Sequence, residues 1–204
     1  MDYMEASGLM ARYGIRIARG IYVSSSEEAM KFSEGRPIAL KAISEKALHK
    51  TKSGLVMLNL SSPEAIKAGY DELAEKGKKL GEYKMLAQEM NPGGLEIIIG
   101  GKIDPQFGKM VLVGLGGIYV ETFKDFAMGV CPVNPKEATG MLGRLRSVGI
   151  IAPDEKTHRA VSALISKVSR LFYENEITEL DLNPVIVHDG SYEAVDIRMI
   201  KDQK

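Results

Sequence analysis

The chain has 204 residues, of which 45% are hydrophobic and 26% charged, and its 27 basic and 27 acidic residues cancel at neutral pH. This length allows one large domain or two small ones with a real core, and the balanced charge argues against a general nucleic-acid binder. No apolar run reaches the roughly 20 residues of a membrane span, the N-terminus lacks a signal-peptide pattern, and a single cysteine excludes an internal disulfide. We therefore expect a cytoplasmic protein without nucleic-acid or membrane binding.

The first half of the chain mixes short helices and strands. A helix is expected at 3–13. Ser25 with Glu28 has the spacing of a capping box, and predicts a second helix through about residue 33. Ser62 followed by Pro63 is typical of a helix start. Strands are predicted at three apolar stretches, 37–43, 54–60 and 84–90.

The second half contains more strands and a long helix. Asn134 followed by Pro135 predicts one helix, and Asp154 precedes a segment whose apolar residues follow a clear 3.6-residue period. Strands are predicted at 95–103, 110–113 and 126–130. The elements do not alternate strictly, which indicates an α+β fold. The turn-forming break at 91–94 predicts two subdomains, 1–90 and 91–204.

The stretch before the C-terminus reads as a β-hairpin, because two alternating runs flank an Asp-Gly pair. With that pair as the loop, opposed positions sum to 379, so Asn183 lies opposite Asp196 and Asp181 lies opposite Arg198. Opposed Cβ atoms are roughly 5 Å apart, and an amide oxygen with a carboxylate suits Mg²⁺. The alternatives are a merely solvated face, or a β-bulge that breaks the register. The other face is predicted to pack on the core: Leu180, Leu182, Ile186, Val195 and Ile197.

Two basic features are candidates for phosphate binding. Lys41 lies inside the apolar strand 37–43, where it is either solvated or held on a rigid strand to meet a phosphate. The stretch 48–54 groups one imidazole, two ammonium groups and two hydroxyls. Its His49 is a candidate nucleophile toward phosphorus, because a neutral imidazole is available near pH 7. The alternative for this stretch is a solvated basic loop.

A glycine-rich turn at 114–121 is another candidate. The P-loop pattern and the Gly-x-Gly-x-x-Gly pattern are both absent, so neither of those nucleotide folds is supported. Gly116 and Gly117 would still let backbone N–H groups approach a phosphate closely, although a tight turn or bulge accounts for them equally well. Glu121 is a candidate to reach a metal or a transferring phosphoryl group, and its alternative is a pair with a nearby lysine.

Residues at the expected subdomain boundary are candidates for binding a nucleoside. The backbone of Gln88, Glu89 and Met90 can hydrogen-bond the edge of an adenine, with Glu89 as a nearby acceptor. Glu96, early in the next strand, can accept from a ribose hydroxyl. Plain strand or loop positions are the alternative for all four residues.

These pieces, in this order, resemble the ATP-grasp β subunits of ADP-forming acetyl-CoA synthetases, within the NDP-forming acyl-CoA synthetase family and related to the succinyl-CoA synthetase β subunit. The resemblance covers the chain from about residue 13 to 198. It rests on eight segments: 37–41, 49–50, 88–90, 96–100, 104–108, 114–121, 179–184 and 194–196. Each segment alone is a weak signal, but eight in order are specific.

The resemblance implies an ATP-grasp fold in which two α/β subdomains enclose a nucleotide. It implies a ligase reaction in which acyl-CoA, ADP and phosphate interconvert with the acid, CoA and ATP. ATP or ADP and Mg²⁺ are the implied cofactors. The implied partner is an α subunit with CoA-binding and phosphohistidine domains, so that the chain acts as part of a hetero-oligomer.

The resemblance also assigns roles to individual positions. Lys41 matches a strand lysine on the nucleotide phosphates, and Glu89 with its neighbours matches the adenine-side hinge. Glu96 matches a second nucleotide-contacting glutamate, and His49 matches a loop histidine that relays the phosphoryl group. The family's Mg²⁺ ligands match the two opposed hairpin residues, Asn183 and Asp196.

Two departures from the family pattern keep other functions open. The family follows His-Lys with a glycine-rich stretch, whereas this chain has Thr51-Lys-Ser-Gly-Leu55, and its N-terminus is short. The alternatives are a non-catalytic or divergent nucleotide-binding regulatory module, and a β subunit of a related ligase such as succinate–CoA ligase.

Overall fold

The computed structural model describes residues 1–44, 54–91, 93–117 and 124–201. Its contacts divide the chain into two units. Residues 18–91 form one, here called the inserted unit, and residues 1–17 with 92–204 form the other, here called the terminal unit. The chain therefore passes from one unit to the other twice, at 17–18 and at 91–92.

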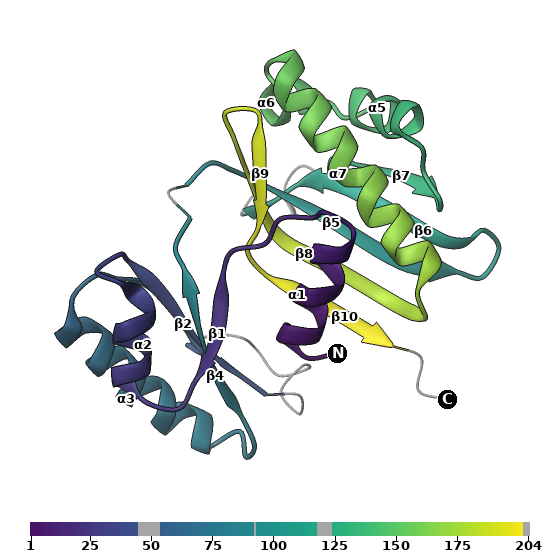
Figure 1. The fold of residues 1–204 in the computed structure, drawn as a ribbon. Helices are drawn as coiled ribbons and strands as arrows, with labels where there is room; N and C mark the ends of the chain where they lie inside the picture. Colours follow the sequence, from purple (N-terminus) through teal and green to yellow (C-terminus); the bar gives the residue numbers. More distant parts are fainter. Residues whose placement is uncertain (45–53, 92, 118–123, 202–204) are drawn as a thin grey trace. The chain divides into compact units, whose positions relative to one another are not determined.

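The expected subdomain 1–90 is wrong for its first 17 residues, which belong to the terminal unit. Helix α1 (Tyr3–Arg12) buries Leu9 and Met10 in the same core as the C-terminal elements. Ile17 then forms a bridge with Ala194 of the closing hairpin. In Figure 1, α1 lies beside the C-terminal strand β10. The sequence predicts this helix, but an expected helix by itself does not indicate which sheet it packs on.

The inserted unit contains a four-stranded antiparallel sheet with two helices on one face (Figure 1). Its strands lie in the order β1 (Gly20–Val23), β4 (Lys84–Glu89), β2 (Ile38–Ile43) and β3 (Val56–Leu60). The helices are α2 (Ser26–Ser33) and α3 (Pro63–Lys78). Ile38, Leu40 and Ala42 of β2 face this helical layer. Because side chains alternate along a strand, Lys41 projects from the opposite face.

Side chains cap both helices of the inserted unit. Ser62 Oγ accepts from the Ala65 N–H at 3.2 Å, as the Ser-Pro start predicts. Ser25 Oγ likewise accepts from the Glu28 N–H at 3.2 Å. The capping box is not closed in the expected way, because the Glu28 carboxylate reaches the Ser24 N–H at 2.7 Å, one residue beyond the N-cap.

The terminal unit contains a six-stranded sheet. Five strands lie in the order β10 (Ile197–Lys201), β8 (Ile177–His188), β5 (Leu95–Asp104), β6 (Gly108–Leu115) and β7 (Phe126–Val130). The sixth strand, β9 (Ser191–Ala194), also pairs with β8. Besides α1, the helices are α5 (Pro135–Gly143), α6 (Val148–Ile151) and α7 (Glu155–Glu174).

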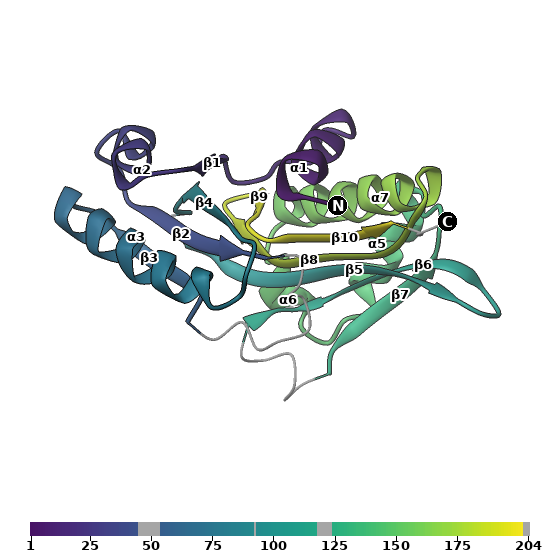
Figure 2. The same cartoon turned by 90° about the horizontal axis from the view of Figure 1, so that it is seen from below.

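The core of the terminal unit lies between its sheet and α1, α5 and α7. Ile97 and Ile99 of β5 pack in one cluster with Leu164 and Phe172 of α7, all of them fully buried. Figure 2 shows α1 and α7 on the same side of β8 and β10. Glu96, at the start of β5, alternates with Ile97 and therefore projects from the face of the sheet opposite to this core. Among the described helices, none is long and apolar enough to cross a membrane.

The closing hairpin has the register predicted from its Asp-Gly loop. His188 pairs with Ser191 and Asp181 with Arg198, and the pairs sum to 379 from the loop as far as Ile200 with Glu179. The last pair, Lys201 with Ile177, is shifted by one residue. Within that gap, the Asn183 N–H donates to the Asp196 carbonyl at 3.3 Å. The register prediction is therefore confirmed.

The β-bulge next to Asn183 lies between β8 and its other neighbour, β5. Ile97 pairs with Val185, whereas Ile99, two residues further along, pairs with Leu182, three residues back. The extra residue of β8 falls at 183–184. A bulge of this kind inserts one residue into one strand and re-aims the side chains around it. The pairing within the hairpin is preserved.

The bulge changes which side chains of the hairpin face the core. Since a one-residue shift reverses the two faces of a strand, Val185 and Val187 join Leu180 and Leu182 in the core cluster. Two residues expected on the core face lie outside that cluster, Ile186 and Val195. The same step leaves Asn183 exposed on the face away from the helices.

Candidate functional site

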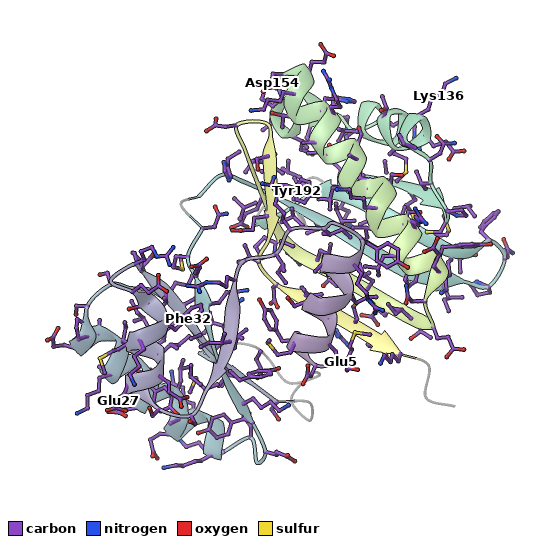
Figure 3. The ribbon with its side chains drawn as sticks, in the orientation of Figure 1. Glu5, Glu27, Phe32, Lys136, Asp154 and Tyr192 are labelled. Atoms are coloured by element: carbon purple, nitrogen blue, oxygen red, sulfur yellow. The ribbon has the colours of Figure 1, made fainter. Side chains whose placement is uncertain are left out.

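Lys41 is held inside the sheet of the inserted unit. It is only 8% exposed, and it pairs with Leu86 of β4 on one side and with Val56 of β3 on the other. Burying an ammonium is costly unless partners or a ligand compensate it. The structure therefore favours an ammonium held on a rigid strand over the solvated alternative. Figure 3 draws the side chains of both units as sticks.

The end of β4 uses its backbone N–H groups within the inserted unit. The Glu89 N–H donates to the Arg19 carbonyl at 2.9 Å, and the Met90 N–H to the Pro37 carbonyl at 3.3 Å. Gln88 is fully buried, and its Nε2 donates to the Ala18 carbonyl at 3.4 Å. These three residues are thus fixed in place, although the N–H groups of Glu89 and Met90 already have acceptors.

The Glu89 carboxylate also has partners. Its Oε1 accepts from Arg19 Nε at 3.0 Å and lies 3.1 Å from Arg36 Nη2. Neither arginine is predicted from the sequence. Arg19 precedes β1 and Arg36 precedes β2, so their contact with Glu89 depends on strand pairing and leaves no periodic signal in the sequence.

In the terminal unit, the structure brings Glu96, Gly116 and Gly117 together. The Gly116 N–H donates to the Glu96 carbonyl at 2.8 Å. A Cβ on Gly116 would lie 2.8 Å from the Glu96 carbonyl carbon, and one on Gly117 would lie 2.7 Å from Glu96 Oε2. Gly117 also has a φ of +63°, which favours glycine. Both glycines therefore allow the backbone at 116–117 to lie directly against Glu96.

Asn183 and Asp196 lie side by side, as the hairpin register predicts. Asn183 is exposed and Asp196 is half-buried, and the backbone bond between them fixes their spacing. An amide oxygen and a carboxylate are hard donors that suit Mg²⁺, which keeps most of its positions for water and phosphate oxygens. The described residues contain no cluster of three or more His, Cys, Asp or Glu that would form a complete protein cage. The donor set thus fits Mg²⁺ better than a metal held by protein ligands alone.

Two predicted site residues, His49 and Glu121, lie outside the described residues. The structure therefore adds nothing to the roles that the sequence predicts for them. The remaining predicted residues fall into four groups: Lys41 on β2, Gln88 to Met90 at the end of β4, Glu96 with the two glycines, and Asn183 with Asp196.

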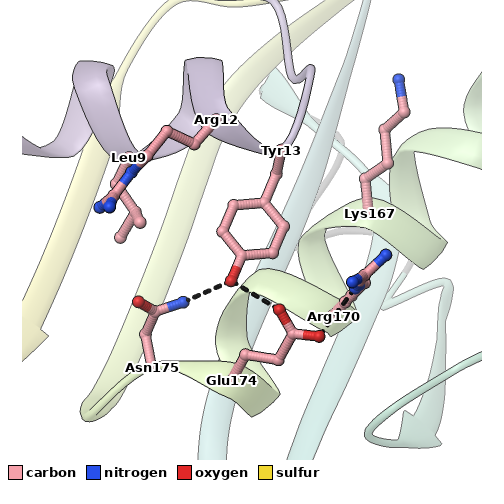
Figure 4. Close-up of a pocket in the computed structure, with 7 residues that line it drawn as sticks. All are labelled: Leu9, Arg12, Tyr13, Lys167, Arg170, Glu174 and Asn175. Carbon is pink, nitrogen blue, oxygen red and sulfur yellow. Dashed lines mark hydrogen bonds and ion pairs between the residues drawn. The ribbon is translucent and has the colours of Figure 1, made fainter.

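A cavity of about 500 Å³ lies elsewhere in the terminal unit, between α1 and the end of α7 (Figure 4). Tyr13 Oη donates to Glu174 Oε2 at 2.8 Å and accepts from Asn175 Nδ2 at 2.9 Å. Burial, followed by the bond to Glu174, raises the pKa of Tyr13. The bond from Arg170, followed by that from Tyr13, lowers the pKa of Glu174. None of the predicted site residues lines this cavity.

Comparisons with known proteins give one consistent result. A family model described as an ATP-grasp domain matches residues 1–200. The β subunit of ADP-forming acetate–CoA ligase II from Pyrococcus furiosus is 34% identical over 210 residues, covering 96% of this chain and 89% of that subunit. ADP-forming acetate–CoA ligase I from Archaeoglobus fulgidus is 33% identical, and the match covers 96% of this chain but 30% of that longer protein.

Solved structures agree with these sequence matches. Acetyl-coenzyme A synthetase 1 of Ca. Korarchaeum cryptofilum, in complex with coenzyme A, Ca-AMPCP and HgCl⁺, aligns with a TM-score of 0.89 at 35% identity. The alignment covers 98% of this chain and 92% of that chain. The same synthetase with coenzyme A and Mg-AMPPCP, its phosphohistidine segment pointing towards the nucleotide binding site, aligns with a TM-score of 0.81 at 34% identity. The two units described above are thus shared with a nucleotide-binding protein of known structure.

Proposed function

The chain belongs to the ATP-grasp domain family, and from this premise we propose that it is the nucleotide-binding β subunit of an ADP-forming acetyl-CoA synthetase. The observation that carries the proposal is the match along 89% of a separate β subunit, against 30% of a single-chain ligase. The rest of the longer protein then corresponds to a partner. We propose that this partner is an α subunit with CoA-binding and phosphohistidine domains, and that both work in the cytoplasm.

In this proposal the chain positions ADP or ATP and supplies positive charge to the phosphates. Lys41 is the fixed ammonium, and its burial on a central strand strengthens its interaction with a phosphate oxygen. Glu96, braced by Gly116 and Gly117, accepts from a ribose hydroxyl. Gln88 and Met90, at the end of β4, line the base. Such a preorganised site stabilises charge as it develops, without reorganising during the reaction.

Asn183 and Asp196 would hold Mg²⁺. The ion, when bound, supplies positive charge between phosphoryl oxygens. We also propose that His49 relays the phosphoryl group from the phosphohistidine of the partner, and that Glu121 reaches the metal or the transferring group. The overall reaction interconverts acyl-CoA, ADP and phosphate with the acid, CoA and ATP.

A reconstitution assay tests the proposal. The chain is mixed with its α partner, acetyl-CoA, ADP–Mg²⁺ and labelled phosphate, and labelled ATP is measured over time. We expect labelled ATP only when both subunits are present. A chain that binds ADP but forms no ATP with its partner would instead be a non-catalytic module. Replacing acetyl-CoA with succinyl-CoA in a parallel reaction identifies a succinate-type ligase.

A further inference from the structure

Four charged side chains form a closed ring at one end of the inserted unit. This charge ring consists of Arg19, Glu34, Arg36 and Glu89. Glu89 Oε1 lies 3.0 Å from Arg19 and 3.1 Å from Arg36. Glu34 closes the ring, with Oε2 2.9 Å from Arg36 and Oε1 3.5 Å from Arg19. Each arginine bridges both glutamates, and the four charges cancel.

The charge ring spans three neighbouring strands. Arg19 directly precedes β1, Arg36 lies two residues before β2, and Glu89 is the last residue of β4, the strand between them. Glu34 is the C-cap of α2 and has a left-handed backbone, with a φ of +49°. The ring therefore ties one helix end to three strand ends.

An aromatic side chain also contacts the charge ring. The guanidinium of Arg19 lies 4.8 Å from the ring centroid of Phe32, which Figure 3 labels on α2. Phe32 is itself buried in the core of the inserted unit. A cation over an aromatic face adds attraction and restricts where the guanidinium can lie. Arg19 is thus held by an aromatic face and two carboxylates together.

The backbone bonds at this end depend on the same residues. The carbonyl of Arg19 accepts from the Glu89 N–H, and that of Pro37, next to Arg36, accepts from the Met90 N–H. The chain also enters the inserted unit at residue 18 and leaves it at residue 91, beside the ring. The ring and these bonds together fix the last residues of β4.

We propose that Arg19, Glu34 and Arg36 are positioning residues for the nucleotide site, and that the Glu89 carboxylate completes their ring instead of contacting the nucleotide. The inference rests on the proposed function, in which Gln88 and Met90 line the base. A single exposed ion pair contributes little to stability, but a network that joins three strands orders their ends before the ligand arrives. A preorganised site then avoids the cost of ordering these residues on binding.

A double-mutant cycle tests the proposal. Arg36→Gln, Glu89→Gln and the double variant are prepared in the full chain. ADP–Mg²⁺ affinity is measured by calorimetry, and amide hydrogen exchange is measured at Glu89 and Met90 without nucleotide. We expect each single variant to weaken binding by roughly three- to tenfold, typical of one coupled charge pair, and to speed exchange at both amides. The double variant should be no weaker than the worse single variant.

A matched control and the contrary outcomes complete the test. Arg159 forms an exposed pair with Glu155 on α7 at 2.8 Å, so Arg159→Gln should change neither readout. If the effects of Arg36→Gln and Glu89→Gln add, Glu89 contacts the nucleotide directly and the proposal is wrong. Unchanged amide exchange in both single variants overturns it as well. If the parent chain binds no ADP–Mg²⁺, the proposed function fails together with the positioning role, and exchange alone then reports whether the ring holds β4.

Discussion

At the scale of single residues, residue type and strand context identified chemistry better than they identified partners. Lys41 was recognisable because a charged side chain inside an apolar strand is costly to bury without a compensating partner or ligand. The structure does bury it. Glu96 with the two glycines was found as separate signals, which only the fold joins. Arg19 and Arg36 gave no signal, because ion pairs between residues far apart in sequence follow no period.

Replacing Lys41 with methionine should separate binding from folding. Lys41→Met keeps the length of the side chain and removes a buried charge, so the unfolding temperature should stay constant or rise. ADP–Mg²⁺ affinity should fall by about tenfold or more, because one charge-assisted contact to a phosphate is lost. Calorimetry and thermal unfolding measure the two effects.

The control for this substitution is Lys78→Met on the surface of α3, where the lysine side chain is 65% exposed. This variant should bind ADP–Mg²⁺ like the parent. Equal affinities for Lys41→Met and the parent would exclude Lys41 from phosphate binding.

At the scale of elements, local signals predicted what a segment forms, and long-range pairing decided how it faces. The hairpin register followed from the Asp-Gly loop, because a tight loop fixes the pairs that follow it, here as far as Ile200 with Glu179. The position of the bulge at 183–184 could not be predicted from the sequence, because it depends on how β8 pairs with β5. Ile186 and Val195, predicted on the core face, lie outside the core cluster.

The N-cap of α7 should give a pH-dependent stability. Asp154 accepts from the N–H and the hydroxyl of Thr157, both at 2.8 Å, and the backbone bond, followed by the side-chain bond, lowers the pKa of Asp154. A lowered folded-state pKa means stability that is present above the unfolded pKa of about 3.9 and is lost as pH falls through the folded value. The unfolding temperature of Asp154→Ala should therefore lie below that of the parent at pH 7, and the difference should shrink below about pH 4.

Thermal unfolding across this pH range measures the effect. Asp154→Asn is the control, since asparagine also caps helices well but does not titrate. Its difference from Asp154→Ala should stay nearly constant with pH. A difference between the parent and Asp154→Ala that is the same at pH 3 and pH 7 would contradict the role of the ionised cap.

At the scale of the whole molecule, the chain forms two units, each with its own core, and passes between them at 17–18 and at 91–92. The boundary predicted near residue 90 lies close to the observed one, because the turn-forming residues 91–94 are visible in the sequence. Nothing in the sequence indicates that α1 packs with the C-terminal elements. The proposed nucleotide contacts are divided between the units, with Lys41 and the end of β4 in one, and Glu96, Asn183 and Asp196 in the other. Each unit has its own core, so the effect of nucleotide on each unit can be measured separately.

The proposed contacts predict how nucleotide protects the chain. A ligand that binds only the folded state at 100 times its Kd stabilises that state by about 2.7 kcal/mol, which slows fully cooperative amide exchange about 100-fold. We expect ADP–Mg²⁺ to protect Leu40 in β2 and Ile99 in β5 together, since each lies in the core of one unit. In Asp196→Ala, protection at both amides should require more ADP, and Mg²⁺ should no longer increase it. Protection confined to one of the two amides would show that the nucleotide contacts a single unit, and unchanged Mg²⁺ dependence in Asp196→Ala would remove the hairpin from the metal site.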